Sequence, residues 1–286
     1  MSFVVEEKND PPVWRGMDRA ALDRAYDNSG AVAESGQYLA GWYTRTAALR
    51  AEPGHLLDLR YGPRERNRID IYRCGHADAP MLVFVHGGYW QRNSKEIFGC
   101  MAQGPITAGL DVALVGYTLA PDASLAEIVA EVRAAISFIR QSSSNLGTGK
   151  DRLVISGWSA GGHLAASAMD MAEVDAGLTI SGVFDLEPIL LGSLNDKLGL
   201  IREDVQRLSP MQNLPSRAGN LVVAYGTAEL PELQRQSRDY LAAWQAGGLN
   251  GLLVPIEGSN HFSILEQLAQ PDGLLAREAA RLGGLS

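Results

Sequence analysis

The sequence predicts an α/β protein with a mostly parallel β-sheet, and two observations favour this class. Six continuous apolar runs follow one another from residue 81 onward, and helical patterns separate most of them. Continuous apolar runs are typical of strands that are covered on both faces, as in parallel sheets. Their alternation with helices indicates right-handed crossovers, with helices on both faces of the sheet.

The expected elements can be justified in chain order. Residues 1–55 are expected to form an N-terminal helical extension, because 18–27 and 37–50 have apolar residues at helical spacing. Residues 56–61 and 68–73 alternate apolar and polar side chains around a turn, which predicts an antiparallel hairpin at one sheet edge. Buried strands are predicted at 81–86, 111–117, 153–156, 177–181, 220–225 and 251–256. Helices are predicted at 97–108, 124–141, 164–171 and 232–246.

Two later segments lack a regular pattern. Residues 142–151 are polar and read as a loop. Residues 186–217 contain three prolines and are too long for a plain connection, so they are expected to form a small cap or lid. No repeat or linker divides the chain, and a single domain over 1–286 is therefore expected.

Composition indicates an ordinary globular protein of 286 residues, with 46% apolar residues, 20% charged residues and a net charge of −8. This charge argues against nucleic acid or an anionic membrane as a partner, and the basic cluster at 63–68 reads as a solvated turn. Cys74 and Cys100 are too few for a disulfide framework. The chain lacks an 18-residue apolar run, and its start lacks a secretory pattern, so a cytoplasmic location is expected. The sequence allows a homodimer without defining the oligomeric state.

The chemistry centres on Ser159, in the sequence Gly-Trp-Ser-Ala-Gly between an apolar run and a small-residue helix. Strand, sharp turn and helix form the context in which G-x-S-x-G presents a nucleophilic serine. Gly157 and Gly161 lack Cβ atoms, so the backbone bends tightly and the helix packs close to the strand. Alone, the pattern is equally typical of a simple turn, and the rest of the chain has to support it.

A His-Gly-Gly-Tyr-Trp stretch follows the first buried strand directly. In hydrolases with this kind of serine turn, such a loop supplies backbone N–H donors to an oxyanion hole. The expected donors are the N–H groups of Ala160 and Gly88, with Gly87 or Tyr89 completing the set. His86 is expected to orient the loop, because its place before the serine is the wrong chain order for the base.

The base is expected to come last in the chain, and His261 lies directly after the final apolar run. The acid is expected after the preceding run. Glu229 is the first carboxylate there and is the preferred candidate, while Glu232 and Asp185 remain alternatives. A carboxylate in this place holds the imidazole in the correct tautomer and stabilises the imidazolium.

At this point the chain resembles a known family. The segments HGGYW, YTLAP, GWSAGGH, ISGVFDLEP, ELPELQRQS and GSNHF occur in the order found in the bacterial kynurenine formamidases, or arylformamidases. The resemblance runs from about Asp18 to the last helix. It implies an α/β-hydrolase fold, Ser159 as nucleophile, His261 as base and Glu229 as acid. It also implies cleavage of an N-formyl arylamine without a metal or cofactor.

The expected activity is therefore hydrolysis of a small aromatic amide, with N-formyl-L-kynurenine as the first candidate substrate. Tyr89, Trp90 and Trp158 are expected to form flat apolar walls, although each is also suited to the core. A carboxylesterase for short-chain esters uses the same machinery and is the main alternative, since fold does not decide between them. A non-catalytic binding protein on this scaffold is the alternative from another class.

Overall fold

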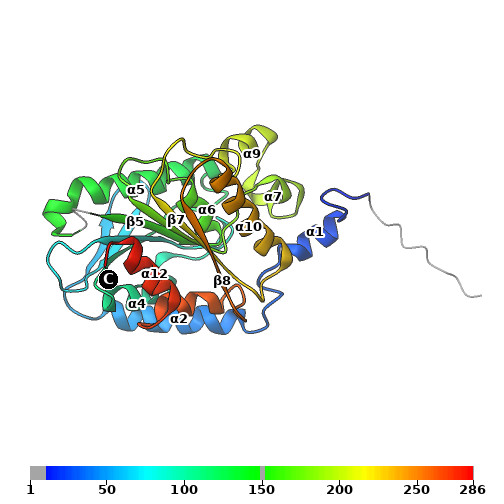
Figure 1. The fold of residues 1–286 in the computed structure, drawn as a ribbon. Helices are drawn as coiled ribbons and strands as arrows, with labels where there is room; N and C mark the ends of the chain where they lie inside the picture. Colours follow the sequence, from blue (N-terminus) through cyan, green and yellow to red (C-terminus); the bar gives the residue numbers. More distant parts are fainter. Residues whose placement is uncertain (1–10, 149–151, 286) are drawn as a thin grey trace, which may run out of the picture.

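The computed structural model describes residues 11–148 and 152–285, and the expectations for 1–10, 149–151 and 286 lie outside this part of the chain. Its centre is an eight-stranded sheet in the order β1-β2-β4-β3-β5-β6-β7-β8 (Figure 1). The strands are β1 (Leu56–Arg60), β2 (Arg68–Tyr72), β3 (Met81–Val85), β4 (Asp111–Val115), β5 (Leu153–Trp158), β6 (Ala176–Ile180), β7 (Asn220–Gly226) and β8 (Gly251–Ile256).

The pairing confirms the mostly parallel sheet. Strands β3 to β8 are joined by parallel ladders, and β1 and β2 form an antiparallel hairpin at one edge. Strand β2 also pairs antiparallel with β4, so the hairpin continues the main sheet. Every residue of β3, β4, β5 and β6 is buried, because helices cover both faces and leave no solvent-facing row.

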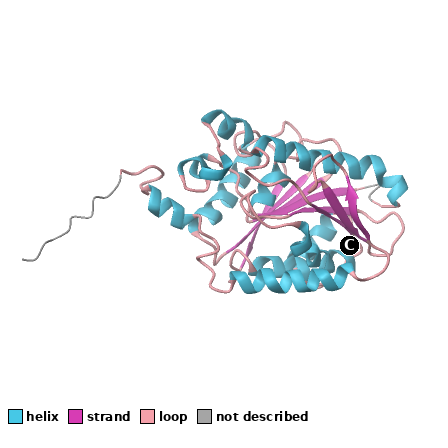
Figure 2. Cartoon of the chain, turned by 180° about the vertical axis from the view of Figure 1, so that it is seen from behind, coloured by secondary structure: helices cyan, strands magenta, loops and turns pink. Residues whose placement is uncertain are grey.

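Two helical layers cover the sheet, as Figures 1 and 2 show from opposite sides. One core packs beneath α5, α6 and α10, and the other packs beneath α2 and α12. The helices are α1 (Arg19–Ala25), α2 (Ser35–Arg50), α3 (Lys95–Phe98), the 3₁₀ turn η1 (Gly99–Ala102), α4 (Gln103–Thr107), α5 (Leu125–Leu146), α6 (Ala160–Ala166), α7 (Glu187–Leu191), α8 (Asn195–Leu198), α9 (Arg202–Leu208), α10 (Pro231–Ala246), the 3₁₀ turn η2 (Ser263–Leu265), α11 (Glu266–Ala269) and α12 (Leu274–Leu282).

Three sequence-based boundaries were wrong. Helix α5 runs to Leu146, into the segment expected to be a loop, and ends where Gly147 adopts the left-handed conformation with φ 66°. The helix expected at 97–108 is broken into α3, η1 and α4. Helix α6 begins at Ala160, next to the start at Gly161 that the small-residue stretch predicts, but it ends at Ala166 and not at the expected residue 171.

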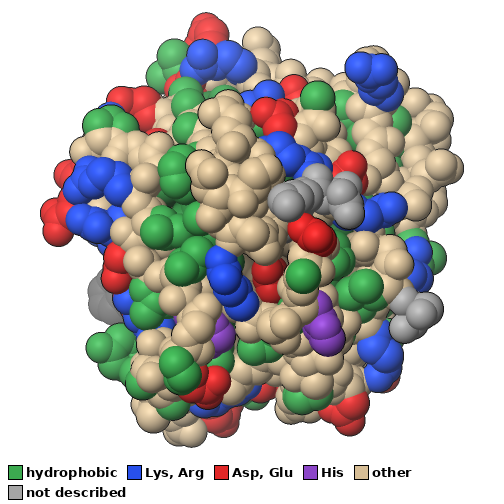
Figure 3. Space-filling model, turned by 90° about the vertical axis from the view of Figure 1, so that its left-hand side faces the viewer, with side chains coloured by type: hydrophobic (Ala, Val, Ile, Leu, Met, Phe, Trp, Pro, Cys, Tyr) green, Lys and Arg blue, Asp and Glu red, His purple; other side chains and the backbone are tan. Residues whose placement is uncertain are grey.

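The segment 186–217 contains three short helices, α7, α8 and α9, that the sequence pattern did not reveal. Its role as a cap stays a prediction. No helix among the described residues has the length and apolarity needed to cross a bilayer. On the face seen in Figure 3, acidic and basic side chains are interspersed and are not gathered by sign.

The first described part of the chain is hydrogen-bonded to the first turn of α10. The Trp14 indole N–H and the Tyr26 hydroxyl both donate to Glu232 Oε2, each at 3.1 Å. On the other side, Asp23 Oδ1 accepts from the Ser193 N–H at 2.7 Å. Helix α1 and the turn after it are therefore fixed between α10 and the segment 186–217, next to the carboxyl ends of the strands.

Candidate active site

Ser159 stands at a strained turn between β5 and α6. Its backbone has φ 58° and ψ −119°, a combination that L-residues rarely adopt. A Cβ on Gly161 would lie 2.0 Å from the Val85 carbonyl oxygen, and one on Gly157 would lie 2.1 Å from the Gly161 carbonyl oxygen. Both positions therefore require glycine, and their absence of side chains lets α6 start directly against β3 and β5.

The loop after β3 lies beside this turn. A Cβ on Gly87 would come within 2.9 Å of the Ser159 Cβ, so the two backbones are in close contact. Gly88 has φ 124°, which favours glycine, and Tyr89 follows with φ 50°. Ala160 is the first residue of α6, and its N–H therefore has no partner within the helix. The structure brings the expected oxyanion-hole segments together at Ser159.

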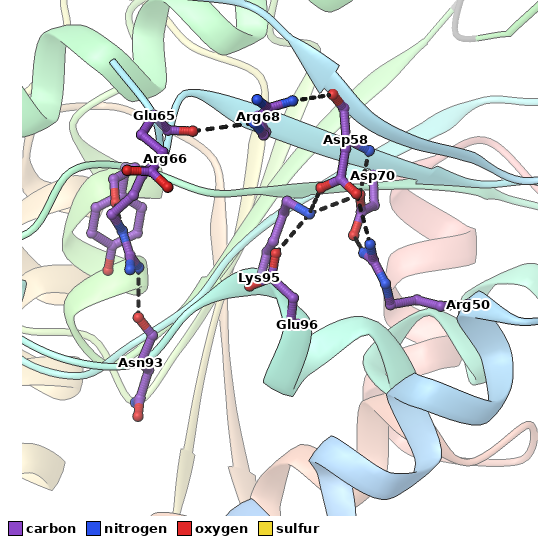
Figure 4. Close-up of polar contacts among 10 residues, drawn as sticks. Arg50, Asp58, Glu65, Arg66, Arg68, Asp70, Asn93, Lys95 and Glu96 are labelled. Atoms are coloured by element: carbon purple, nitrogen blue, oxygen red, sulfur yellow. Dashed lines mark hydrogen bonds and ion pairs between the residues drawn. The ribbon is translucent and has the colours of Figure 1, made fainter.

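Two side chains that the sequence analysis missed hold this loop from behind. Asn93 Nδ2 donates to the Gly87 carbonyl at 3.1 Å, and Arg66 Nη2 donates to the Asn93 carbonyl at 2.6 Å (Figure 4). His86 Nδ1 also lies 2.9 Å from the Gly87 carbonyl, in line with its expected orienting role. Because the peptide group is planar, fixing the Gly87 carbonyl also fixes the direction of the Gly88 N–H. Arg66 is thus more than a solvated turn residue.

A charged cluster anchors the chain just beyond the loop. The buried Lys95 ammonium contacts Asp58 at 2.7 Å and Asp70 at 2.8 Å, and Arg50 also pairs with Asp70 (Figure 4). Burial alone would lower the pKa of Lys95, but its carboxylate partners outweigh burial and raise the pKa. The cluster joins the start of α3 to the β1–β2 hairpin and to α2, so the segment after the loop is held firmly.

His261 and Glu229 lie next to each other, and His261 lines the same cavity as Ser159. His261 follows β8, Glu229 follows β7, and His261 Nδ1 lies 3.1 Å from Glu229 Oε2. The other carboxylate oxygen accepts from the Ser181 hydroxyl at 2.5 Å and from the Gly226 N–H at 2.7 Å. Ser181 was missed by sequence reasoning, although its place directly after β6 is where site residues gather in parallel sheets. Three donors therefore fix this buried carboxylate.

The two alternative acids lie elsewhere. Glu232 accepts hydrogen bonds from Trp14, Tyr26 and Arg235. Burial would raise its pKa, but the Arg235 contacts outweigh burial and lower the pKa. Asp185 accepts from the Glu187 N–H at 3.1 Å, and burial raises its pKa. The structure brings neither carboxylate to His261.

The three aromatic side chains expected as pocket walls take different places. Trp158 lines the cavity at Ser159, and its indole N–H donates to the His261 carbonyl at 2.8 Å. Tyr89 also lines it. Trp90 is wholly buried and packs edge-on against His163, with ring centroids 5.0 Å apart, so the structure does not bring it to the cavity.

The cavity at Ser159 is small, at about 50 Å³. His261 and Ser159 both line it, and Asn28, Ser29 and Leu39 of the N-terminal segment contribute further lining. A second cavity of about 280 Å³ shares Tyr89 and Arg92 with the first, so the two adjoin. Among the described residues, no group of three or more His, Cys, Asp or Glu side chains is arranged to hold a metal ion.

Two buried histidines near the site predict a pH dependence of stability. Burial lowers the pKa values of His86 and His163 to about 4. In the unfolded chain an imidazole takes up its proton below about pH 6.5, so the unfolded state binds more protons between these values. The free energy of unfolding is therefore expected to fall as pH drops from about 6.5 to 4, by up to about 1.4 kcal/mol per histidine and pH unit.

Urea unfolding at pH 7, 6 and 5 measures this slope. His163→Gln removes one of the two titrating groups and is expected to flatten the slope, whereas the matched change at the exposed His76 leaves it as in the wild type. Equal slopes for the wild type and His163→Gln would contradict the assignment.

Comparison with known proteins shows the family to which this chain belongs. Residues 69–187 match the family model described as BD-FAE. The kynurenine formamidase of Salmo salar is 30% identical over 96% of this chain and 99% of its own length, and that of Danio rerio is 29% identical over the same shares. A protein of Silicibacter sp. TM1040, provisionally described as a thioesterase, superposes with a TM-score of 0.82 at 27% identity, covering 90% of this chain and 97% of its own. The chain is a hydrolase of the α/β-hydrolase fold and belongs to the kynurenine formamidase family.

Proposed function

We propose that this protein cleaves N-formyl arylamines, with Ser159 as nucleophile, His261 as general base and Glu229 as its carboxylate partner. The observation that carries the proposal is the His261–Glu229 hydrogen bond of 3.1 Å at the cavity that Ser159 also lines. The family relationship supports this activity, because the relatives from Salmo salar and Danio rerio are both named kynurenine formamidases.

The first half of the reaction forms a formyl-enzyme. Ser159 Oγ bonds to the formyl carbon while its proton moves to His261 Nε2, and the carbonyl electron pair becomes an oxyanion. The N–H groups of Ala160 and Gly88 stabilise that charge, and one such donor typically contributes about 3 kcal/mol. The nitrogen lone pair then takes the proton from His261, and when the oxyanion collapses, the C–N bond breaks and its electron pair goes to the protonated nitrogen. The arylamine leaves.

Water completes the cycle by hydrolysing the formyl ester. His261 takes a proton as the water oxygen bonds to the formyl carbon, and the second oxyanion occupies the same hole. Its collapse breaks the bond to Ser159 Oγ, which recovers its proton from His261, and formic acid leaves and loses its remaining proton to solvent as formate. Glu229 stays ionised throughout and stabilises each imidazolium. Its three hydrogen-bond donors keep the carboxylate fixed without a change of geometry.

The shape of the two cavities supports a formyl substrate. About 50 Å³ at Ser159 suits the smallest acyl group, whereas drug-sized ligands occupy pockets of about 300 to 1,000 Å³. The adjoining cavity of about 280 Å³ has room for the rest of the substrate. Its lining carries both charges, with Asp23 and Asp27 beside Arg24 and Arg92. An α-amino acid end, which bears an ammonium and a carboxylate, matches that lining.

A side-by-side kinetic assay tests the proposal. We expect N-formyl-L-kynurenine to be cleaved with a higher kcat/KM than p-nitrophenyl acetate or butyrate. One added methylene costs only about 1–3 kcal/mol in a tight pocket, so short esters should still react. If butyrate exceeds N-formylkynurenine tenfold or more, the protein is a carboxylesterase. An absence of any covalent fluorophosphonate label would indicate a non-catalytic binding protein.

Arg92 provides a test of the amino-acid end. Arg92→Ala is expected to lower kcat/KM for N-formyl-L-kynurenine about tenfold or more, because a charge-assisted hydrogen bond to the carboxylate contributes about 1.5–3 kcal/mol. Formanilide has no carboxylate, so kcat/KM for formanilide should fall much less. The matched variant Arg202→Ala, at an exposed guanidinium of α9, controls for the change of net charge. Equal losses of kcat/KM for both substrates would show that Arg92 does not bind the carboxylate.

A further inference from the structure

Asn28 is a buried polar residue at the cavity that the reaction scheme above does not use. It follows α1 in the turn Asn28-Ser29-Gly30, is only 4% exposed and lines the cavity with Ser159 and His261. It lies directly after the helical stretch expected at 18–27, and the sequence analysis gave it no role. A buried amide is costly unless its polar atoms are paired, so the partners of this side chain are informative.

The hydrogen bonds around Asn28 define which of its atoms is free. The Tyr89 hydroxyl has one proton, and it donates that proton to the Tyr26 carbonyl at 2.7 Å. The Tyr89 oxygen can therefore only accept from Asn28, which it does from Nδ2 at 2.9 Å. This fixes the orientation of the amide and leaves Asn28 Oδ1 buried without a hydrogen-bond partner among the described residues. The free atom is an acceptor.

We propose that Asn28 Oδ1 accepts the N–H of the scissile amide and so selects secondary aryl amides over esters of the same shape. The inference rests on the proposed function, because it assigns a specificity-determining residue to that reaction. An amide differs from the matching ester at one atom next to the carbonyl, where N–H replaces oxygen. Ser159, His261 and the oxyanion hole act on both, so none of them distinguishes the two.

The hydrogen bond from the scissile N–H to Asn28 Oδ1 becomes stronger as the reaction proceeds. In the ground state the amide nitrogen shares its lone pair with the carbonyl. After Ser159 attacks, the nitrogen takes a proton from His261 and acquires positive charge, so its N–H becomes a stronger donor. An acceptor that is already oriented stabilises this change more than it stabilises the bound substrate, which is the condition for a catalytic gain. An ester oxygen has no hydrogen to offer Asn28.

The test compares formanilide with phenyl formate, which differ only at the leaving atom. Asn28→Leu removes the acceptor at similar size, and Asn28→Ala removes it without introducing new side-chain atoms. In both variants we expect the ratio of the amide kcat/KM to the ester kcat/KM to fall at least about tenfold. The ratio is measured within one preparation, so partial misfolding cancels. Ser35→Ala is the control, because its hydroxyl donates to the Ser29 carbonyl in the same turn and Ser35 is not among the residues that line the cavity; it should keep the ratio within about threefold.

The outcomes separate the two proposals. If kcat/KM falls by the same factor for formanilide and for phenyl formate in both Asn28 variants, Asn28 only supports Tyr89 and the oxyanion loop. The inference is then wrong. If Ser35→Ala lowers the ratio as much, the effect belongs to the turn as a whole and the inference is wrong as well. If the wild type cleaves phenyl formate but no formamide, the proposed function fails and the inference fails with it.

Discussion

Ser159→Ala is expected to lower kcat for N-formyl-L-kynurenine by about a million-fold, the loss typical of removing a nucleophile that acts as part of a triad. The expected size follows from the roles of the neighbouring groups. Without the hydroxyl, His261 has no proton to accept and the oxyanion hole has no tetrahedral intermediate to bind. The measurement is steady-state turnover with purified enzyme, supported by mass spectrometry after sulfonyl fluoride treatment.

The fold of this variant should remain intact, because a hydroxyl contributes little to a core that the glycines around it already define. Ser159 takes φ 58°, and alanine accepts that strain no worse than serine. The thermal midpoint is therefore the control, and it should shift by a few degrees at most. Ser167→Ala, at the C-terminal end of α6, is a matched variant, since its hydroxyl donates to the His163 carbonyl. Retention of even a tenth of the wild-type turnover in Ser159→Ala would show that another residue is the nucleophile.

Ser159 could be predicted from the sequence and Asn28 could not, and the difference has a physical reason. Ser159 lies in a pattern whose residues depend on one another locally, since Gly157 and Gly161 are required by contacts within the same turn. The strands were predicted for a similar local reason, because burial on both faces leaves an unbroken apolar run. The place of His261 was inferred from chain order and from its position directly after the final apolar run, and the family resemblance implied the same residue.

Asn28 has no such local signature. Its role depends on Tyr89, which is 61 positions away in the chain, and on Tyr26 at the end of a short helix. Arg66 and Asn93 are similar, because their function arises only when the loop after β3 meets the edge hairpin. The segment 186–217 escaped pattern analysis because helices of four to seven residues are too short to show a period.

Glu229→Gln addresses the position that the sequence left open, and it is expected to lower kcat by about 10³ to 10⁴. Glutamine keeps the size of the side chain and can still accept a hydrogen bond, but it cannot offset the positive charge that His261 gains. The amide also brings N–H donors toward the Ser181 hydroxyl and the Gly226 N–H, which both donate to the carboxylate in the wild type. Imidazole tautomer and site geometry are therefore disturbed together.

Glu232→Gln and Asp185→Asn are the matched controls, because they remove the two rival carboxylates by the same chemistry. Glu232 binds Trp14, Tyr26 and Arg235. Its loss should therefore lower the thermal midpoint, while kcat stays close to the wild-type value. Asp185 only supports the first turn of α7. Each control should keep kcat within about tenfold of the wild type, because the hydrogen bonds of Glu232 and Asp185 go to residues other than His261. If the thousand-fold loss appears at Glu232 or Asp185 and not at Glu229, the 3.1 Å contact between Glu229 and His261 is not the catalytic one.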